Sequence, residues 1–300
     1  NVTLFVEGKK VIENKNLIFG LHNVFYKLEN GTPIRIEYKF NIKVLPETPI
    51  TAVIEMAEDF DKILINGQEI KPLKKKGEKG AFDKDKSWLD VNFTKVPLDG
   101  YVTEGCNILV LEGKKVNNIT SSGAHNRVES FMDHYPTELE AVYITGNFKV
   151  TGDTATGLYI DAVNSENHSN NLVQSGYPFY AGKAIFTQSF RLDKIPQKTL
   201  LKIKDVCAAS IKLYVNNQFV DTGYIKPFMF DVSSFVKKGN NDIKIVAATT
   251  LFNLMGPNWI SGVEERTGIS PETFVDFRHF TREYKLLPFG IGEVLLLEAN

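Results

Sequence analysis

Short stretches in which hydrophobic and polar residues alternate recur along the whole chain. The clearest examples are residues 34–40, 200–204, 211–215 and 243–246. Because successive side chains of a strand point to opposite faces, this alternation predicts strands with one buried face. Helical spacing is nearly absent. The best helical candidate is 270–280, where Ser270 is a suitable N-cap and Pro271 a suitable first residue.

Two dipeptides mark tight turns between such strands. Asn66-Gly67 and Asn216-Asn217 each follow a strand-like segment, and a second one begins immediately after each, at 68–70 and 218–220. Asn and Gly tolerate the positive φ angles that a two-residue hairpin requires. The pattern therefore predicts two β-hairpins.

The two hairpins belong to a longer internal repeat. Residues 63–68 recur as 213–218 at an offset of 150, and the offset after the hairpins is 134. The matched pairs include Phe40 with Phe190, Pro46 with Pro196, Val96 with Phe230, Gly105 with Gly239 and Asn107 with Asn241. The 16 missing residues lie around the Lys-rich stretch 71–86, which we interpret as a loop inserted in the first copy. We expect its lysines, Lys74–Lys76, to be solvated.

Many short strands and few helices predict an all-β fold of the sandwich or barrel type. The 300 residues suffice for two domains with separate cores. We place these domains at residues 1–150 and 151–300, with the boundary in the polar stretch 151–156. Closing strands are expected at 140–144 and 293–297.

Composition narrows the classes of partner. The chain is 43% hydrophobic and 24% charged, as in globular proteins, and its net charge is −1 without a basic stripe. This argues against nucleic acid, and no apolar run approaches the roughly 18 residues of a membrane helix. Cys106 and Cys207 do not occupy matching positions, which argues against a disulfide framework. The chain begins at Asn1 without a signal peptide, so we expect a fragment of a longer protein and leave its compartment open, extracellular and periplasmic locations included.

The second copy resembles a known domain family. Its features are Val215-Asn216-Asn217, then 227–232 (PFMFDV), then Gly239-Asn240-Asn241, within residues 176–250. This order resembles the sugar-binding, galactose-binding-like jelly-roll domain of glycoside hydrolase family 2 enzymes. Residues 177–182 (YPFYAG) and the closing stretch are similar, more loosely, to rhamnosidase-like bacterial glycosidases. The resemblance implies two tandem jelly-roll β-sandwich domains, and it implies no catalytic residue, because the barrel that carries the catalytic carboxylates has no counterpart here.

Catalytic and metal-binding motifs are not evident in the sequence. Glycoside hydrolysis needs two carboxylates facing each other across a cleft, and the Glu264-Glu265 doublet is more simply a solvated loop. The spacings typical of zinc sites, nucleophile elbows and phosphate loops do not occur. We expect no cofactor. A structural calcium ion near Glu140 and Glu293, at the start of corresponding last strands, is a weaker expectation.

Two loops are the predicted carbohydrate sites. Aromatic residues can stack on sugar rings, and amide, carboxylate and guanidinium groups can bind hydroxyls. Residues 254–266 supply Asn258, Trp259, Glu264 and Arg266, although Trp259 would more often be a buried plug. The matching loop of the first copy, 121–136, supplies His125, Arg127 and Asp133.

These observations lead to one hypothesis and two alternatives. The hypothesis is a non-catalytic carbohydrate-binding or substrate-framing part of a larger bacterial glycoside hydrolase, whose partners are a carbohydrate and the catalytic domain of the parent chain. The first alternative is a purely structural pair of domains that packs against that catalytic domain. The second is a small intact hydrolase, which needs paired carboxylates in a cleft. An exposed aromatic platform would favour sugar binding, whereas an apolar patch would favour docking.

Overall fold

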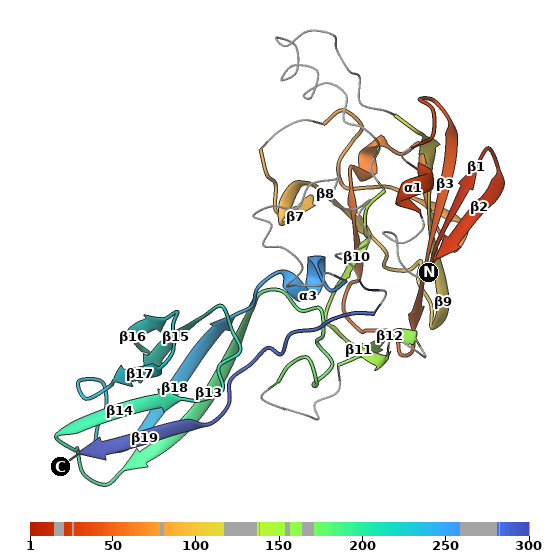
Figure 1. Ribbon diagram of the computed structural model, residues 1–300. Coiled ribbons are helices and arrows are strands. Elements are labelled where there is room, and N and C mark those ends of the chain that lie inside the picture. Colours follow the sequence, from red (N-terminus) through yellow and green to blue (C-terminus); the bar gives the residue numbers. More distant parts are fainter. Residues whose placement is uncertain are drawn as a thin grey trace. The chain divides into compact units, whose positions relative to one another are not determined.

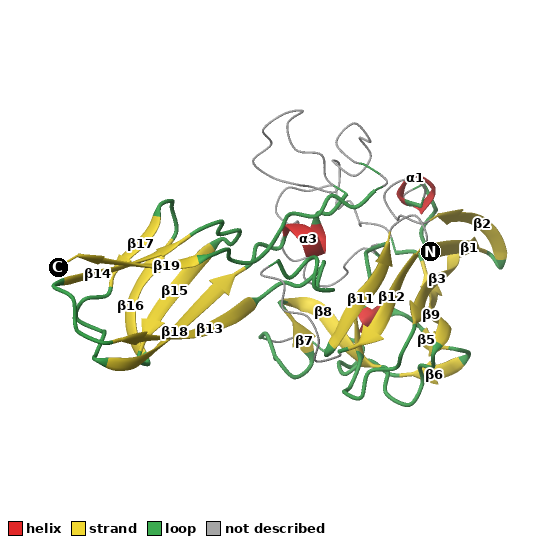
Figure 2. Ribbon diagram, turned by 90° about the horizontal axis from the view of Figure 1, so that it is seen from below, coloured by secondary structure: helices red, strands yellow, loops and turns green. Residues whose placement is uncertain are grey.

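A computed structural model describes residues 1–14, 21–25, 27–78, 81–116, 137, 139–153, 157–163, 171–258, 281 and 283–299. They form two compact units (Figure 1). The first unit contains the described residues of Asn1–Asn164 and Ser261–Arg282, and the second contains those of Ser165–Ile260 and Glu283–Asn300. Strands dominate both units, which confirms the predicted all-β fold (Figure 2).

The first unit consists of two antiparallel sheets with one extra parallel contact. One sheet has the order β11-β12-β3-β9-β5-β6, with the β1-β2 hairpin also attached to β3, and the other has the order β10-β4-β8-β7. The elements are β1 (Val2–Val6), β2 (Lys9–Asn14), α1 (His22–Phe25), β3 (Pro33–Ile42), β4 (Thr51–Glu55), a 3-10 turn (Ala57–Asp59), β5 (Lys62–Ile65), β6 (Gln68–Ile70), β7 (Ser87–Trp88), β8 (Asp90–Pro97), β9 (Gly105–Lys114), β10 (Tyr143–Thr145), β11 (Phe148–Asp153) and β12 (Gly157–Ala162).

Alternating side chains of both sheets form one core in this unit. Ile36 and Leu109 of the larger sheet and Ala52 and Val96 of the smaller sheet belong to the same buried cluster. At about 25 cal/mol per Å² of apolar surface, burial of these faces is the main stabilising term of the sandwich.

The first unit extends beyond residue 150, where we expected the boundary. Strand β12 pairs in parallel with the end of β3, with Tyr159 opposite Asn41 and Ile160 opposite Ile42. The polar stretch 151–156 therefore includes the end of β11, which pairs with β12. Sequence alternation alone does not indicate this partner, because β3 precedes β12 by more than a hundred residues.

The second unit has a four-stranded sheet, β13-β18-β15-β16, and a three-stranded sheet, β17-β14-β19. The elements are β13 (Lys183–Leu192), β14 (Lys198–Ile203), β15 (Ser210–Val215), β16 (Gln218–Gly223), β17 (Phe228–Asp231), β18 (Gly239–Ala248), α3 (Phe252–Met255) and β19 (Val294–Ala299). Leu201, Phe230, Leu213 and Ile245 from both sheets share a second buried core. The strand order follows that of β3-β9-β5-β6 and β10-β4-β8 in the first unit.

Both predicted hairpin turns are present. The φ angles are 50° and 84° at Asn66 and Gly67, and 50° and 65° at Asn216 and Asn217. Asn217 thus adopts the left-handed conformation that Gly67 adopts in the first unit, which an Asn side chain tolerates. The predicted closing strands overlap β10 and β19, which both pair with the middle strand of the smaller sheet.

A buried amide network holds the first turn. Asn66 Nδ2 donates to the Tyr101 carbonyl (2.9 Å) and to Asn107 Oδ1 (2.8 Å). Asn107, which is fully buried, donates to the carbonyls of Thr103 (2.7 Å) and Gly105 (3.2 Å) and accepts from the Thr103 N–H (2.9 Å). These bonds satisfy a polar side chain that burial would otherwise destabilise.

The second unit contains the same network at the corresponding positions. Asn216 Nδ2 donates to the Phe235 carbonyl (2.8 Å) and to Asn241 Oδ1 (2.9 Å). Asn241, also fully buried, donates to the carbonyls of Lys237 (2.8 Å) and Gly239 (3.0 Å) and accepts from the Lys237 N–H (2.8 Å). The units therefore share an interior polar contact as well as a strand order.

The Lys-rich insert of the first unit is partly buried, so the expectation of solvated lysines is wrong for Lys74. Lys74 is only 8% exposed, its Nζ lies 3.7 Å from Glu58 Oε1, and it donates to the Val91 carbonyl. The reason is that the insert folds back on the edge of β8. Lys76, by contrast, is exposed beside Asp61.

Helical structure is sparse where the chain is described. Asn253 of α3 forms a pair of 2.9 Å hydrogen bonds between its amide and the backbone of Leu287, which joins residues far apart in sequence. The predicted helix 270–280 lies outside the described residues. None of the described helices has the length and hydrophobicity needed to cross a bilayer.

Candidate functional site

Of the predicted carbohydrate-binding residues, the structure describes only Asn258. It is buried, with 8% of its surface exposed, and the preceding Pro257 carbonyl accepts a hydrogen bond from Lys285 N (2.6 Å). The other six lie outside the described residues, and their roles stay predictions: Trp259, Glu264, Arg266, His125, Arg127 and Asp133.

A row of side chains crosses the outer face of the four-stranded sheet in the second unit. Thr187 of β13 pairs with Lys244 of β18, Lys244 with Tyr214 of β15, and Tyr214 with Phe219 of β16. The residues that flank Tyr214 in β15, Leu213 and Val215, are fully buried. Because side chains alternate along a strand, the row Thr187–Lys244–Tyr214–Phe219 faces away from the core. We refer to it as the aromatic row.

The aromatic row presents one open ring. The Tyr214 and Phe219 rings meet edge to face, with centroids 5.6 Å apart and planes inclined by 62°. Lys244 Nζ lies 4.4 Å from the Tyr214 centroid, a cation–π contact that covers part of that ring. Phe219 is 51% exposed. Phe219 is therefore available for stacking, while Tyr214 and Lys244 fix its surroundings and supply polar groups.

Further polar groups lie in the adjacent rows of the same face. Ser189 Oγ donates to Asp242 Oδ1 over 2.7 Å, next to Thr187 and Lys244 on their strands. On the other side, Lys212 of β15 is exposed. The face thus combines an open aromatic ring with hydroxyl, carboxylate and ammonium groups.

The corresponding row of the first unit has different chemistry. Glu37, Val110, Leu64 and Glu69 occupy the four positions. Beside them, Arg35 lies 2.8 Å from Glu37 Oε1 and 2.7 Å from Glu112 Oε1. This row has no aromatic side chain, and its two carboxylates form ion pairs with residues outside the row, Glu37 with Arg35 and Glu69 with Lys71.

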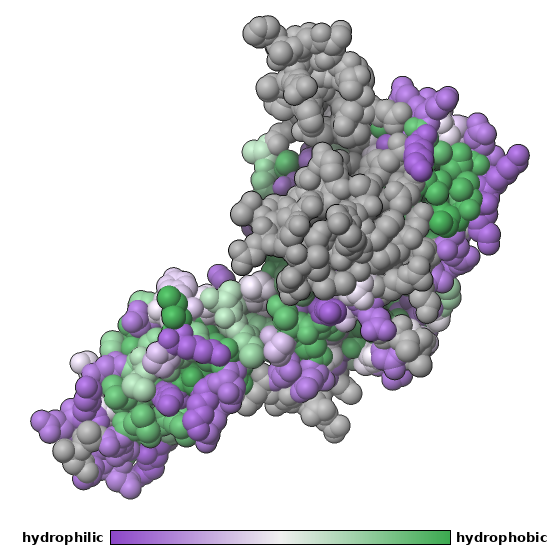
Figure 3. Space-filling model, in the orientation of Figure 1, coloured by the Kyte–Doolittle hydropathy of each residue, from purple (hydrophilic) through white to green (hydrophobic). Residues whose placement is uncertain are grey.

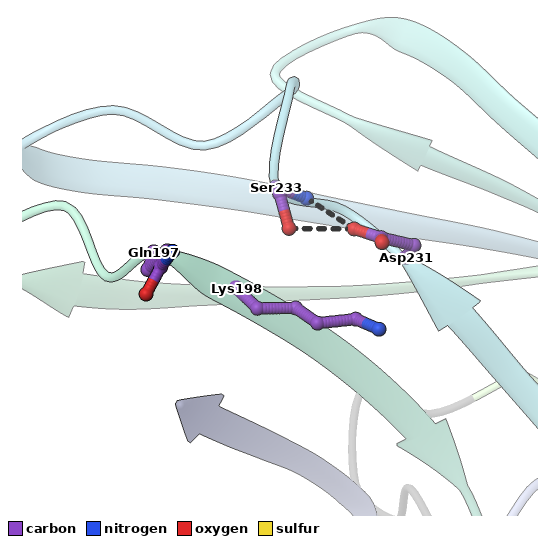
Figure 4. A pocket seen from close by; sticks show the side chains of 4 residues that line it. All are labelled: Gln197, Lys198, Asp231 and Ser233. Carbon is purple, nitrogen blue, oxygen red and sulfur yellow. Dashed lines mark hydrogen bonds between the residues drawn. The ribbon is translucent and has the colours of Figure 1, made fainter. Parts of the chain in front are cut away.

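A hollow of about 520 Å³ opens on the outer face of the three-stranded sheet of the second unit, lined by Gln197, Lys198, Asp231 and Ser233 (Figure 4). Asp231 Oδ1 accepts from the Ser233 hydroxyl (2.6 Å) and N–H (3.0 Å), and these bonds, with the nearby charge of Lys198, lower the pKa of Asp231. Ser233 Oγ in turn accepts from Thr199 N (2.9 Å).

Comparison with the first unit indicates that these contacts of Asp231 and Ser233 have a structural role. There, Asp99 occupies the position of Ser233, and its Oδ1 accepts from the Ile50 N–H over 2.9 Å. Each side chain thus caps the start of the middle strand of its smaller sheet. We therefore assign Asp231 and Ser233 to turn stabilisation rather than to catalysis.

Metal binding gains no geometric support from the part of the chain that is described. Within it, no group of three His, Cys, Asp or Glu side chains could hold an ion. Glu293 forms an ion pair with Lys204 (2.9 Å), and the Glu140 carbonyl accepts from the Tyr38 hydroxyl (2.8 Å). The calcium site stays a prediction. Cys106 and Cys207 are both free and exposed.

The sequence contained a signal for the aromatic row that loop-based reasoning missed. Tyr214 alternates with Leu213 and Val215, so its large ring is out of phase with the hydrophobic residues of its strand. Phe219 lies opposite Tyr214, as the second residue after the Asn216-Asn217 turn. An aromatic pair on the polar face of a hairpin is the pattern that indicates an exposed platform.

No protein-family model and no curated protein matches the chain. Among solved structures it is similar to a rhamnosidase from Novosphingobium sp. PP1Y, with 15% identity, a TM-score of 0.32 and coverage of 90% of this chain and 23% of that one. The α-L-rhamnosidase of Streptomyces avermitilis matches with 11% identity, a TM-score of 0.32 and coverage of 78% and 22%.

A glycosyl hydrolase family 2 member from Bacteroides cellulosilyticus matches with 12% identity, a TM-score of 0.25 and coverage of 81% of this chain and 28% of that one. The chain thus spans about a quarter of the length of these enzymes. At these scores the similarity carries no argument about activity.

Proposed function

We propose that this chain is a non-catalytic, carbohydrate-binding or substrate-framing part of a larger glycoside hydrolase. The observation that carries the proposal is the exposed Phe219 ring, which lies against Tyr214 among polar groups. Sugars present flat C–H faces that can stack on such a ring, while hydroxyl groups bind ammonium and carboxylate groups beside it. Lys244 and Asp242 are placed to take that second role.

The proposal extends to the origin of the two units. We infer that they are copies of one jelly-roll-like domain, an inference supported by their equal strand orders and by their two matching amide networks. On this view the second copy carries the sugar site, and the corresponding row of the first copy, which has no aromatic side chain, does not. The catalytic domain of the parent chain is the other proposed partner.

The experiment is a glycan-array screen of this chain, followed by affinity measurements on any glycan that binds. Phe219→Ala removes the stacking surface, and we expect its affinity to fall about tenfold or more. Glu69→Ala, at the corresponding position of the first unit, is the matched control and should bind like the unaltered chain. Thermal unfolding of both variants verifies that they fold.

Trp259→Ala distinguishes the aromatic row from the predicted loop. If Trp259→Ala abolishes binding and Phe219→Ala does not, the sugar site belongs to the loop 254–266 and the aromatic row is not the site. If no glycan binds, the chain is a structural module and the proposal is wrong.

A further inference from the structure

A second surface of the second unit is a groove at the open side of the sandwich. It has a volume of about 270 Å³ and lies between β16, at the edge of one sheet, and β17, at the edge of the other. We call it the β16–β17 groove. Its lining residues are Asp221, Thr222, Gly223, Tyr224, Ile225, Pro227, Phe228, Met229 and Phe230.

Aromatic and aliphatic side chains surround the groove, while polar atoms make up the larger share of its lining surface. Phe228 and Phe230 lie at its base with 6% of their surfaces exposed, and Gly223 fits tightly against them, since a Cβ there would lie 2.7 Å from Phe228 Cδ1. Tyr224 and Ile225 are 68% and 82% exposed. On the face of the second unit visible in Figure 3, hydrophobic residues lie among hydrophilic ones. Exposed apolar side chains rimmed by polar groups can mark an interaction site.

The groove also has a free strand edge. Strand β17 pairs with β14, and no described strand pairs with its other edge. The corresponding strand of the first unit, β8, pairs with β4 on one side and with β7 on the other. The two units therefore differ in whether this edge is occupied.

The first unit shows what kind of segment occupies the edge. Residues of the insert add to β8 as an extended segment, with Ser87 opposite Thr94. Both backbone groups of Lys95 bond to the insert, because its N–H donates to the Lys86 carbonyl (2.9 Å) and its carbonyl accepts from Leu73 N (2.9 Å). The Trp88 ring then packs on Tyr143 with centroids 5.6 Å apart.

The corresponding position in the second unit is Met229, which is 42% exposed. Lys95 faces Val53 of β4, and Met229 faces Lys202 of β14 in the same register. Because the Lys95 backbone groups point away from β4, those of Met229 point away from β14 and toward the open edge. The groove thus combines a strand edge that has no partner among the described strands with the exposed side chains of Tyr224 and Ile225.

We propose that the β16–β17 groove binds an extended peptide segment of a partner polypeptide, which adds as an antiparallel strand to β17 and places a large apolar side chain against Tyr224 and Ile225. The occupant's chemistry follows from the insert of the first unit, which supplies a strand and an aromatic side chain at the corresponding edge. Strand addition obtains affinity from main-chain hydrogen bonds and specificity from side-chain contacts. This site is separate from the aromatic row.

The test selects peptides from a random phage-displayed library on the full chain and measures their affinities as synthetic peptides. Ile225→Ser should weaken binding about tenfold, because it removes apolar surface that the peptide buries. Met229→Pro deletes one edge N–H and should weaken binding by a similar factor, while the β14 pairing persists since that N–H is not part of it. Ile185→Ser, at a 64% exposed residue of β13, is the matched control and should bind normally.

Three outcomes would overturn the proposal. They are a selection that enriches no peptide family, selected peptides that bind Met229→Pro and Ile225→Ser as well as the unaltered chain, and a chain that sediments as a dimer which Met229→Pro dissociates. The last result would assign the groove to a second copy. Thermal unfolding of each variant, compared with the Ile185→Ser control, separates loss of binding from loss of folding.

Discussion

The same row of four sheet positions differs completely between the two units. In the first unit it carries Glu37, Val110, Leu64 and Glu69, and in the second it carries Thr187, Lys244, Tyr214 and Phe219. Yet the buried amides behind both hairpins make the same bonds. Interior and turn positions determine the sandwich, so the outer rows are free to change. Function is therefore to be sought where the units diverge.

The smaller sheets show a second divergence. In the first unit the insert occupies the free edge of β8 and buries Lys74 beside Glu58, whereas the corresponding edge of β17 is open in the described part of the second unit. The difference indicates that the free edge of this strand can be treated in two ways. It can be covered by a segment of the same unit, or it can stay free to pair with another chain.

Removal of the Lys74 ammonium should have the largest effect on this comparison. Lys74→Ala removes the cation beside the buried Glu58 and leaves the Thr94 hydroxyl (2.6 Å) as its hydrogen-bond donor, and breaking such a pair costs about 3 kcal/mol of unfolding free energy. We expect this loss of unfolding free energy in the first unit and not in the second. Hydrogen exchange of peptides from each unit, measured in increasing urea, gives the stability of the two units separately.

Lys76→Ala is the matched control, because the Lys76 side chain is 69% exposed in its ion pair with Asp61. Exposed pairs contribute less than about 1 kcal/mol. Equal losses in Lys74→Ala and Lys76→Ala would contradict the buried ion pair.

The buried amide network, which both units share, predicts a smaller loss of unfolding free energy that is similar in the two units. Asn107→Ala and Asn241→Ala each delete a fully buried amide and leave backbone groups without their partner, which costs about 2 kcal/mol. Each substitution should destabilise its own unit, by similar amounts. Asn240→Ala, next to Asn241 but exposed, is the control. Different losses in Asn107→Ala and Asn241→Ala would show that the networks are not equivalent.

The sequence predicts the features that depend on local chemistry. Asn66 and Asn216 indicate tight turns because their side chains tolerate positive φ, and the strands on both sides alternate because one face is buried. The parallel contact of β12 with β3 has no such local cause, since it depends on a partner distant in sequence. The burial of Lys74 depends likewise on Glu58, which lies in another segment.

The candidate site could be predicted less well than the fold. The sequence predicts sugar ligands in two loops, around Trp259 and His125, and of the predicted residues only Asn258 lies in the described part of the chain. The aromatic row is formed by strands instead, and Phe219 meets Tyr214 only when the hairpin register is known. That register includes a bulge between Leu213 and Tyr214, which sequence alternation does not specify.

Alkaline pH should distinguish the smaller sheets of the two units. Burial, followed by the charges of Glu140 and Glu55, raises the pKa of Tyr143 to about 12, whereas the corresponding residue of the second unit is Leu295. A raised folded-state pKa stabilises the unit fully below the unfolded value of 10.0, and this contribution is lost as pH rises toward 12. Tyr143 alone should contribute on the order of 2 kcal/mol to the alkaline loss of unfolding free energy in the first unit.

Tyr143→Phe should remove only its own share of that alkaline loss, as measured by urea unfolding at a series of pH values. The rest should persist, because burial raises the pKa of Tyr38 in the same unit further than that of Tyr143. An unchanged alkaline loss in Tyr143→Phe would assign the whole effect to other groups.

The smallest effect is expected at Ser233, which caps the start of β14 in the second unit and hydrogen-bonds to Asp231. The Ser233 hydroxyl, then its N–H, then Lys198 lower the pKa of Asp231, so the stabilisation is present above the unfolded pKa and is lost as pH falls through the lower folded value. Ser233→Ala removes the hydroxyl donor and should move the pKa of Asp231 back toward the ordinary value of 3.8, though not fully, since the N–H remains. Carboxylate NMR during an acid titration measures this shift.

Two further substitutions at Ser233 connect the titration to the first unit. Ser233→Thr keeps the hydroxyl and should leave the Asp231 titration unchanged. Ser233→Asp copies Asp99, which caps the first unit at this position, and places a second carboxylate beside Asp231. Because like charges disfavour ionisation, the pKa of Asp231 should then rise further than in Ser233→Ala. If it stays low, Ser233 and Asp99 are not interchangeable caps, and the correspondence of the two units fails at this turn.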